Sequence, residues 1–304
     1  MRYHVTHTTR YEYVDAVTLS YNLVRLRPRD HGMQKSLSYE LALSPTPAVS
    51  RERLDYFGNH AVWFSLQEPH TELTITARSE VQVDLVLQPD AAQSAPWEQV
   101  RETLLTVLNP QMLAAREFCF DSPYVARDAE LADYARASFP QGRPLLQAVL
   151  DLTQRIHNEF GFVPGSTTVG TPVLDVLHNR RGVCQDFAHL QIGCLRSLGL
   201  AARYVSGYLA TTPPPGQPRL AGADASHAWV SVFEPDFGWM DFDPTNGIIP
   251  SDSHVTVAWA RDYDDVGPVK GILVGGRRQR LKVSVDVTPA GTSQQPSIGG
   301  VTPA

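Results

Sequence analysis

The chain is poor in cysteine, with three in 304 residues. They are Cys119, Cys184 and Cys194, an odd number that cannot form a disulfide framework without leaving one thiol over. No Cys-x-x-Cys pair and no paired histidine spacing typical of a zinc site occurs. On one helix, Cys184 and Cys194 would lie about 15 Å apart along the axis, beyond the span of about 7 Å that a disulfide allows. The sequence therefore predicts free thiols, no metal and no cofactor.

The sequence also lacks an excess of positive charge and long apolar runs. Its 26 Lys and Arg residues face 32 Asp and Glu residues, for a net charge of −6, whereas nucleic-acid binders carry a basic face. No apolar run reaches the length of a membrane helix, and the polar N-terminus is not typical of a signal peptide. We expect no nucleic-acid partner, no membrane contact and a cytoplasmic location. The oligomeric state stays open.

The length predicts two domains, and the first ninety residues read as strands. Leu37, Tyr39, Leu41 and Leu43 alternate onto one face, the period-two pattern of a half-buried strand. Gly58-Asn59 between two strand-like runs predicts a hairpin. We expect an N-terminal antiparallel β-sandwich over residues 1–92. Its histidines are expected to be surface or partly packed residues: His4, His7, His60 and His70.

The rest of the chain predicts helices first and strands after. We expect a helical connector over residues 93–143 and an α+β domain over residues 144–290, in which helices precede an antiparallel sheet. The Pro- and Gly-rich stretch 211–225 predicts a loop that covers a substrate groove or acts only as a linker. Residues 291–304 are low in apolar content and are expected to be disordered.

Cys184 stands where a helix is predicted to begin, directly after the Arg-Arg-Gly-Val turn. The free backbone N–H groups and the positive dipole end of a helix N-terminus favour a thiolate. The same N–H groups could hold the oxyanion of an acyl-transfer intermediate. Cys194 and Cys119 lie in apolar surroundings and are interpreted as core residues.

A nucleophilic cysteine needs a base, and the base needs a group that orients it. His227 begins the apolar strand "HAWVSVF", and Asp243 precedes a Pro-Thr-Asn-Gly turn after the next strand. An antiparallel hairpin would place the two side by side. Asp241 is an equal candidate for the carboxylate, because residues two apart share a strand face.

Three ordered motifs, "GVCQDFAHL", "HAWVSVF" and "GWMDFDPTNG", resemble the core of the transglutaminase-like superfamily, a rearranged relative of papain-like cysteine proteases. The resemblance covers roughly residues 150–250, and the whole chain is similar to bacterial members with an N-terminal β domain. It implies a triad of Cys184 as nucleophile, His227 as general base and acid, and Asp243 as orienting carboxylate. Further candidates, for substrate binding, are Asp186, Trp229 and Tyr208.

The resemblance implies thiol-dependent acyl transfer at amide bonds of a peptide or protein substrate, through a thioester. We expect hydrolysis, as in a cysteine protease or amidase. Amine transfer, as in a transglutaminase, is the first alternative; a catalytically silent binding module and an arylamine-type acyltransferase are the others. The calcium dependence of vertebrate transglutaminases is not carried over.

Overall fold

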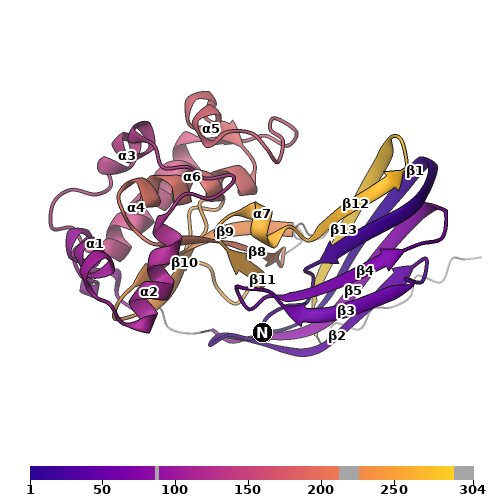
Figure 1. The fold of residues 1–304 in the computed structure, drawn as a ribbon. Coiled ribbons are helices and arrows are strands. Elements are labelled where there is room, and N and C mark those ends of the chain that lie inside the picture. The colour runs from indigo at the N-terminus through magenta and orange to yellow at the C-terminus, as the bar shows by residue number, and fades with distance from the viewer. Residues whose placement is uncertain (86–88, 212–225, 291–304) are drawn as a thin grey trace, which may run out of the picture.

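The computed structural model describes residues 1–85, 89–211 and 226–290, and shows an N-terminal antiparallel sheet joined to an α+β part (Figure 1). Helices α1–α6 lie on one side of the second part, and the strands of the first sheet project from it as an arm (Figure 1). The predicted loop 211–225, apart from residue 211, and the predicted disordered tail 291–304 lie outside the described residues. Within those residues, no helix is long and apolar enough to span a membrane.

The first sheet has seven strands in the order β2-β5-β1-β4-β3, with β12 and β13 also paired to β1. Long alternating runs form these strands, and β3 and β4 make the hairpin predicted at Gly58-Asn59, where Gly58 takes a positive φ of 74°. The strands are β1 Arg2–Val24, β2 Gln34–Ser44, β3 Val49–Leu54, β4 His60–Leu66, β5 His70–Val83, β12 Val269–Gly275 and β13 Gln279–Pro289.

The second part contains a four-stranded antiparallel sheet in the order β10-β9-β8-β11. Helix α6 packs on one face of this sheet, against β8 and β9 (Figure 1). The sheet strands are β8 Ala202–Leu209, β9 Ser226–Glu234, β10 Gly238–Phe242 and β11 His254–Ala260, and the short strands β6 Gly161–Phe162 and β7 Arg181–Gly182 form a separate pair. The α+β fold class predicted from the sequence is confirmed.

Helices precede this sheet in the chain. The apolar stripe of α4 is fully buried and includes Leu145, Val149, Leu152 and Ile156, which explains why a 4-3-4 spacing produces a helix here. Asp128 caps α3 by accepting from the Glu130 backbone N–H. The helices are α1 Trp97–Thr106, α2 Pro110–Arg116, α3 Ala129–Arg136, α4 Leu145–Glu159, α5 Val173–Asn179, α6 Cys184–Ser197 and α7 Tyr263–Val266, with short 3₁₀ turns at Ala91–Gln93 and Glu117–Cys119.

The observed packing differs from the predicted division in two ways. The predicted connector shares its core with α4 and α6, since Val100, Leu104 and Leu131 join the same buried cluster. Strands β12 and β13 fall inside the predicted range 144–290 but pair with β1 of the first sheet. Because β1 is long, it offers room for strands from the other end of the chain, and the N-terminal sheet is completed by C-terminal residues.

Candidate active site

Cys184 is the first residue of α6 and is partly exposed. The turn before it is held by Asp186, whose Oδ2 accepts from the Val183 N–H at 2.8 Å and from the Thr167 hydroxyl at 2.6 Å. A Cβ at Gly182 would lie 2.8 Å from the Asp186 Cβ, so only glycine fits beside this cap. Asp186 therefore fixes the helix start that presents the Cys184 sulfur.

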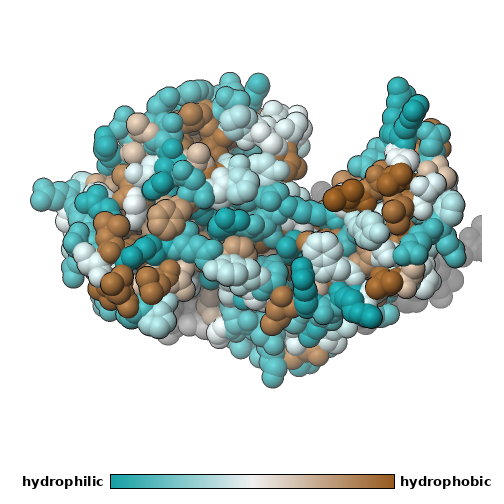
Figure 2. All heavy atoms as spheres, viewed as in Figure 1, coloured by the Kyte–Doolittle hydropathy of each residue, from teal (hydrophilic) through white to brown (hydrophobic). Residues whose placement is uncertain are grey.

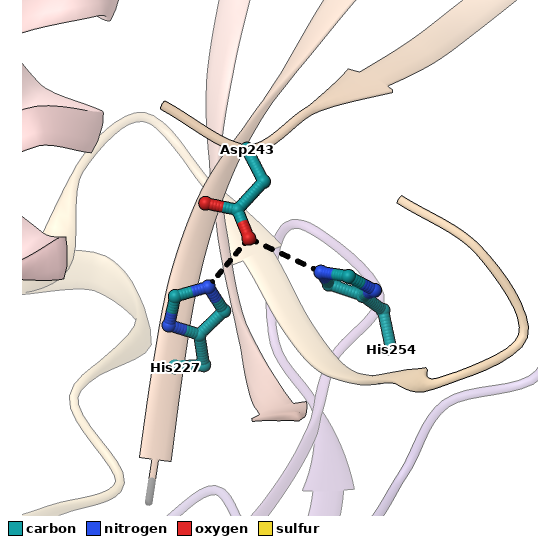
Figure 3. A group of neighbouring side chains, drawn as sticks. All are labelled: His227, Asp243 and His254. Atoms are coloured by element: carbon teal, nitrogen blue, oxygen red, sulfur yellow. Dashed lines mark hydrogen bonds and ion pairs between the residues drawn. The ribbon is translucent and has the colours of Figure 1, made fainter. Parts of the chain in front are cut away.

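His227 and Asp243 meet where the β9–β10 hairpin leads into the following turn (Figure 3). His227 Nε2 lies 2.7 Å from Asp243 Oδ2, and the His227 side chain lines the same cavity as Cys184. With Nε2 bound to the carboxylate, the other ring nitrogen is left for the sulfur. The structure thus brings together the three residues predicted for the triad.

Charge keeps His227 protonated. Burial by itself would lower the pKa of His227, but the hydrogen bonds and charges of Asp243 and Cys184 outweigh it and raise the pKa to about 10. Burial would raise the pKa of Asp243, yet its hydrogen bonds to His227 and His254 hold that pKa well below the usual range. A charged imidazolium therefore lies beside the Asp243 carboxylate, in the cavity that Cys184 also lines.

Asp243 is fully buried, and its carboxylate accepts hydrogen bonds from several groups. Oδ2 lies 3.2 Å from His254 Nε2 and accepts from Asn246 Nδ2 at 2.6 Å, while Oδ1 accepts the backbone N–H of Thr245 at 2.9 Å. His227, Asp243 and His254 bring three possible metal-ligand atoms within 4.8 Å of one another (Figure 3). These atoms already satisfy each other at hydrogen-bond distances, and we interpret them as a hydrogen-bond network.

Both sheets contribute to the cavity over Cys184, which has a volume of about 270 Å³. A water molecule takes about 30 Å³ in the liquid, so the cavity has room for a side chain. The first sheet supplies a wall from β1 and β13 that includes His7, Thr9, Tyr11, Leu281 and Val283. In Figure 2 the surface is hollowed between the helical part and the strand arm, and apolar residues gather on the strand side of the hollow.

The three candidates for substrate binding do not line this cavity. Asp186, Trp229 and Tyr208 are 3%, 0% and 2% exposed and are not among the described residues that line this cavity. Trp229 donates to Asp241 Oδ2 at 2.9 Å, and the Tyr208 hydroxyl lies 3.1 Å from His7 Nδ1. Their polar atoms have partners inside the protein, so the structure gives these three residues positioning contacts in place of surface for a substrate.

The two remaining cysteines are core residues, as predicted. Cys194 and Cys119 are 0% and 9% exposed. Burial raises the pKa of Cys194 to about 12 and that of Cys119 to about 11. Neither thiol is suited to act as a nucleophile at neutral pH.

Residues 3–82 match the model of the bacterial transglutaminase-like N-terminal region, and residues 133–244 match that of the transglutaminase-like superfamily. The chain belongs to the transglutaminase-like superfamily. This bacterial transglutaminase-like protein is 44% identical to an uncharacterized protein of Mycobacterium tuberculosis over 299 residues, which is 95% of this chain and 93% of the relative. Both halves of the molecule are therefore shared with that relative.

Two further proteins are similar to the transglutaminase-like protein, one in sequence and one in fold. It is 32% identical over 128 residues to the protein-glutamine gamma-glutamyltransferase of Pseudomonas aeruginosa, covering 41% of this chain and 19% of that enzyme. The crystal structure of a proposed cysteine protease from Cytophaga hutchinsonii has the same fold, with a TM-score of 0.75 at 22% identity, over 97% of this chain and 93% of the other.

Sequence reasoning missed His254, Asn246 and His7 of this transglutaminase-like protein. Ser253-His254 opens an apolar strand just as Ser226-His227 does, a repeated pattern that pointed to a second buried histidine. Asn246 stands in the same turn as Asp243. His7 was expected to be a surface or partly packed residue but is 1% exposed and lines the cavity, where burial lowers its pKa to about 4. No local pattern indicates that contact, because it depends on how the two sheets pack.

Proposed function

We propose that the protein cleaves amide bonds of peptides or proteins through a thioester on Cys184, as a cysteine protease or amidase. The observation that carries the proposal is that His227, bound to the Asp243 carboxylate, lines one cavity with Cys184, the first residue of a helix. This arrangement provides a nucleophile, a proton donor and an orienting group in reach of one cavity.

In the proposed reaction the Cys184 thiolate attacks the amide carbonyl carbon and forms a C–S bond. The carbonyl oxygen becomes an oxyanion, which free backbone N–H groups of the first α6 turn can stabilise. His227 gives its proton to the amide nitrogen as the C–N bond breaks, and the amine leaves. Water then attacks the thioester, His227 accepts a proton from that water, and the acid leaves as the thiolate re-forms.

Amine transfer is the second candidate, because the chain resembles a gamma-glutamyltransferase over 128 residues. In that case an amine replaces water in the second step. One experiment separates the outcomes: the protein is incubated with a peptide panel and a fluorescent primary amine, and products are identified by mass. Release of free acid supports hydrolysis, and stable amine incorporation supports transfer.

Cys184→Ala is the matched control in this experiment, and Cys194→Ala is the second. We expect Cys184→Ala to abolish both products, while Cys194→Ala removes only a core thiol. A protein that binds peptides from the panel without converting any of them would instead be the silent binding module.

A further inference from the structure

Arg203 is a buried arginine whose Nε has no hydrogen-bond partner among the described residues. It lies on β8, is 8% exposed, and forms no hydrogen bond or ion pair with any residue in the described ranges. Its neighbours are two indole rings: the guanidinium carbon lies 4.2 Å from the ring centroid of Trp239 and 3.8 Å from that of Trp259. Cation–π contact offsets part of the cost of burying the charge, but the buried Nε–H donor lacks an acceptor among the described residues.

Burial lowers the pKa of Arg203 to about 9, partly opposed by the charge of Asp241. The side chain is therefore still positively charged at neutral pH. A planar guanidinium held between aromatic rings is fixed in orientation, and a fixed guanidinium matches the two oxygens of a carboxylate.

Arg203 borders a cavity of about 450 Å³ on the sheet face turned away from α6. That volume lies within the range of about 300–1,000 Å³ that small-molecule sites occupy. Apolar and aromatic side chains form most of its wall, including Phe237, Trp239, Met240, Pro250 and Trp259. Cys184 and His227 do not line it, so this cavity is separate from the one over the thiol.

A negative charge lines the same cavity. Asp241 is among the residues that line it, and its Oδ2 accepts from Trp229 Nε1 at 2.9 Å. Asp241 and Arg203 act on each other through charge, yet no ion pair joins them among the described residues. His31 adds a second buried nitrogen, Nε2, that has no partner in that part of the chain. Side chains of opposite charge thus line one mostly apolar cavity.

These features specify the chemistry of an occupant. A simple anion would approach Asp241 unfavourably, and an uncharged apolar ligand would leave Arg203 unpaired. A second hollow on the other side of Arg203, of about 370 Å³, is lined by Glu117 and offers no additional positive side chain. A ligand with adjacent positive and negative groups and an apolar body satisfies the larger cavity.

We propose that this cavity binds a free α-amino acid with an apolar side chain. The ligand carboxylate accepts hydrogen bonds from Arg203, its ammonium group donates to Asp241, and its side chain packs against Phe237, Trp239 and Met240. The proposal is independent of the chemistry at Cys184.

The test compares L-phenylalanine with two derivatives, by calorimetry and by tryptophan fluorescence of the full-length protein. L-Phenylalaninamide keeps the ammonium group and lacks the carboxylate, whereas N-acetyl-L-phenylalanine keeps the carboxylate and lacks the ammonium group. We expect each derivative to bind at least tenfold more weakly than the amino acid. Equal binding of either derivative, or no binding of L-phenylalanine at 10 mM, would overturn the proposal.

Variants of Arg203 and Asp241 test which residue binds which charged group of the ligand. Arg203→Met should weaken L-phenylalanine binding, and this variant should bind L-phenylalaninamide as well as the amino acid. Asp241→Asn should also weaken L-phenylalanine binding, and it should bind N-acetyl-L-phenylalanine as well as the amino acid. Arg51→Met, at an exposed position on β3, and Cys184→Ala should leave binding unchanged. If Arg203→Met proves unfolded in a thermal melt, the derivative series on the native protein still decides.

Discussion

Asp243 gathers at least five hydrogen-bonding groups on one carboxylate, from the side chains of His227, His254 and Asn246 and the backbone of Thr245 and Asn246. Replacing it with asparagine keeps the shape but removes the charge that holds His227 protonated and oriented. We expect Asp243→Asn to lower kcat/KM for a peptide amide by about 10²–10⁴-fold. Steady-state kinetics measure this, with the exposed Asp236→Asn as control. A loss below tenfold would refute the role of Asp243.

His254 hydrogen-bonds the Asp243 carboxylate, with Nε2 3.2 Å from Oδ2. His254→Gln weakens one charge-assisted hydrogen bond, which is worth about 1.5–3 kcal/mol when lost completely. We expect kcat/KM to fall by up to about tenfold, since glutamine can still donate a hydrogen bond to Asp243. We also expect the pH profile of kcat/KM to shift, because His227 shares that carboxylate. An effect through folding alone would change the thermal midpoint and leave the pH profile as in the native protein.

At the scale of residues, the sequence predicted Cys184, His227 and Asp243 because each belongs to a local motif. The family resemblance assigns the orienting carboxylate to Asp243, because strand periodicity gives Asp241 and Asp243 the same face. In the structure Asp241 forms a hydrogen bond with Trp229, and Asp243 forms one with His227. Tyr208 and Trp229, candidates for substrate binding, do not line the cavity over Cys184, because strand alternation gives the face of a side chain but not what covers that face.

Among the elements, β13 has the most direct consequence for function. Its residues Leu281 and Val283 are 51% and 52% exposed and line the cavity over Cys184. We expect them to contact an apolar side chain of the substrate next to the cleaved amide. Leu281→Ser should then lower kcat/KM for apolar peptides by about five- to tenfold, since burial of a leucine side chain contributes about 1.5–3 kcal/mol when complete.

The matched control is Ile272→Ser on β12, which is 77% exposed and does not line that cavity. It should leave kcat/KM unchanged for every peptide. In Leu281→Ser, the rate at which iodoacetamide alkylates Cys184 should stay as in the native protein, because the reagent needs no side-chain pocket. An unchanged preference among peptides would show that β13 takes no part in selection.

Element prediction succeeded where the pattern is local. The β3–β4 hairpin and helix α4 follow from turn residues and apolar spacing within about twenty residues. The partners of β12 and β13 do not, because they pair with β1 across more than 240 residues of sequence, and strand alternation carries no information about the partner strand.

For the whole molecule, His227 links stability to pH. Its pKa is raised from 6.5 to about 10 in the folded state, so its contribution is complete below pH 6.5, falls as pH rises from 6.5 to about 10, and is lost above. We expect the free energy of unfolding to decline over this interval, measured by urea denaturation. His227→Gln cannot titrate and should show a smaller decline. Equal slopes for both proteins would contradict the raised pKa.

The central claim is that an acyl group passes through a thioester on Cys184. The most direct measurement is to mix the protein with an activated peptide ester, quench in acid within milliseconds to seconds, and map the adduct by peptide mass. The account predicts acylation of Cys184, absent in Cys184→Ala and strongly slowed in His227→Ala. Acylation at another residue, or amide cleavage by Cys184→Ala at the native rate, would contradict it.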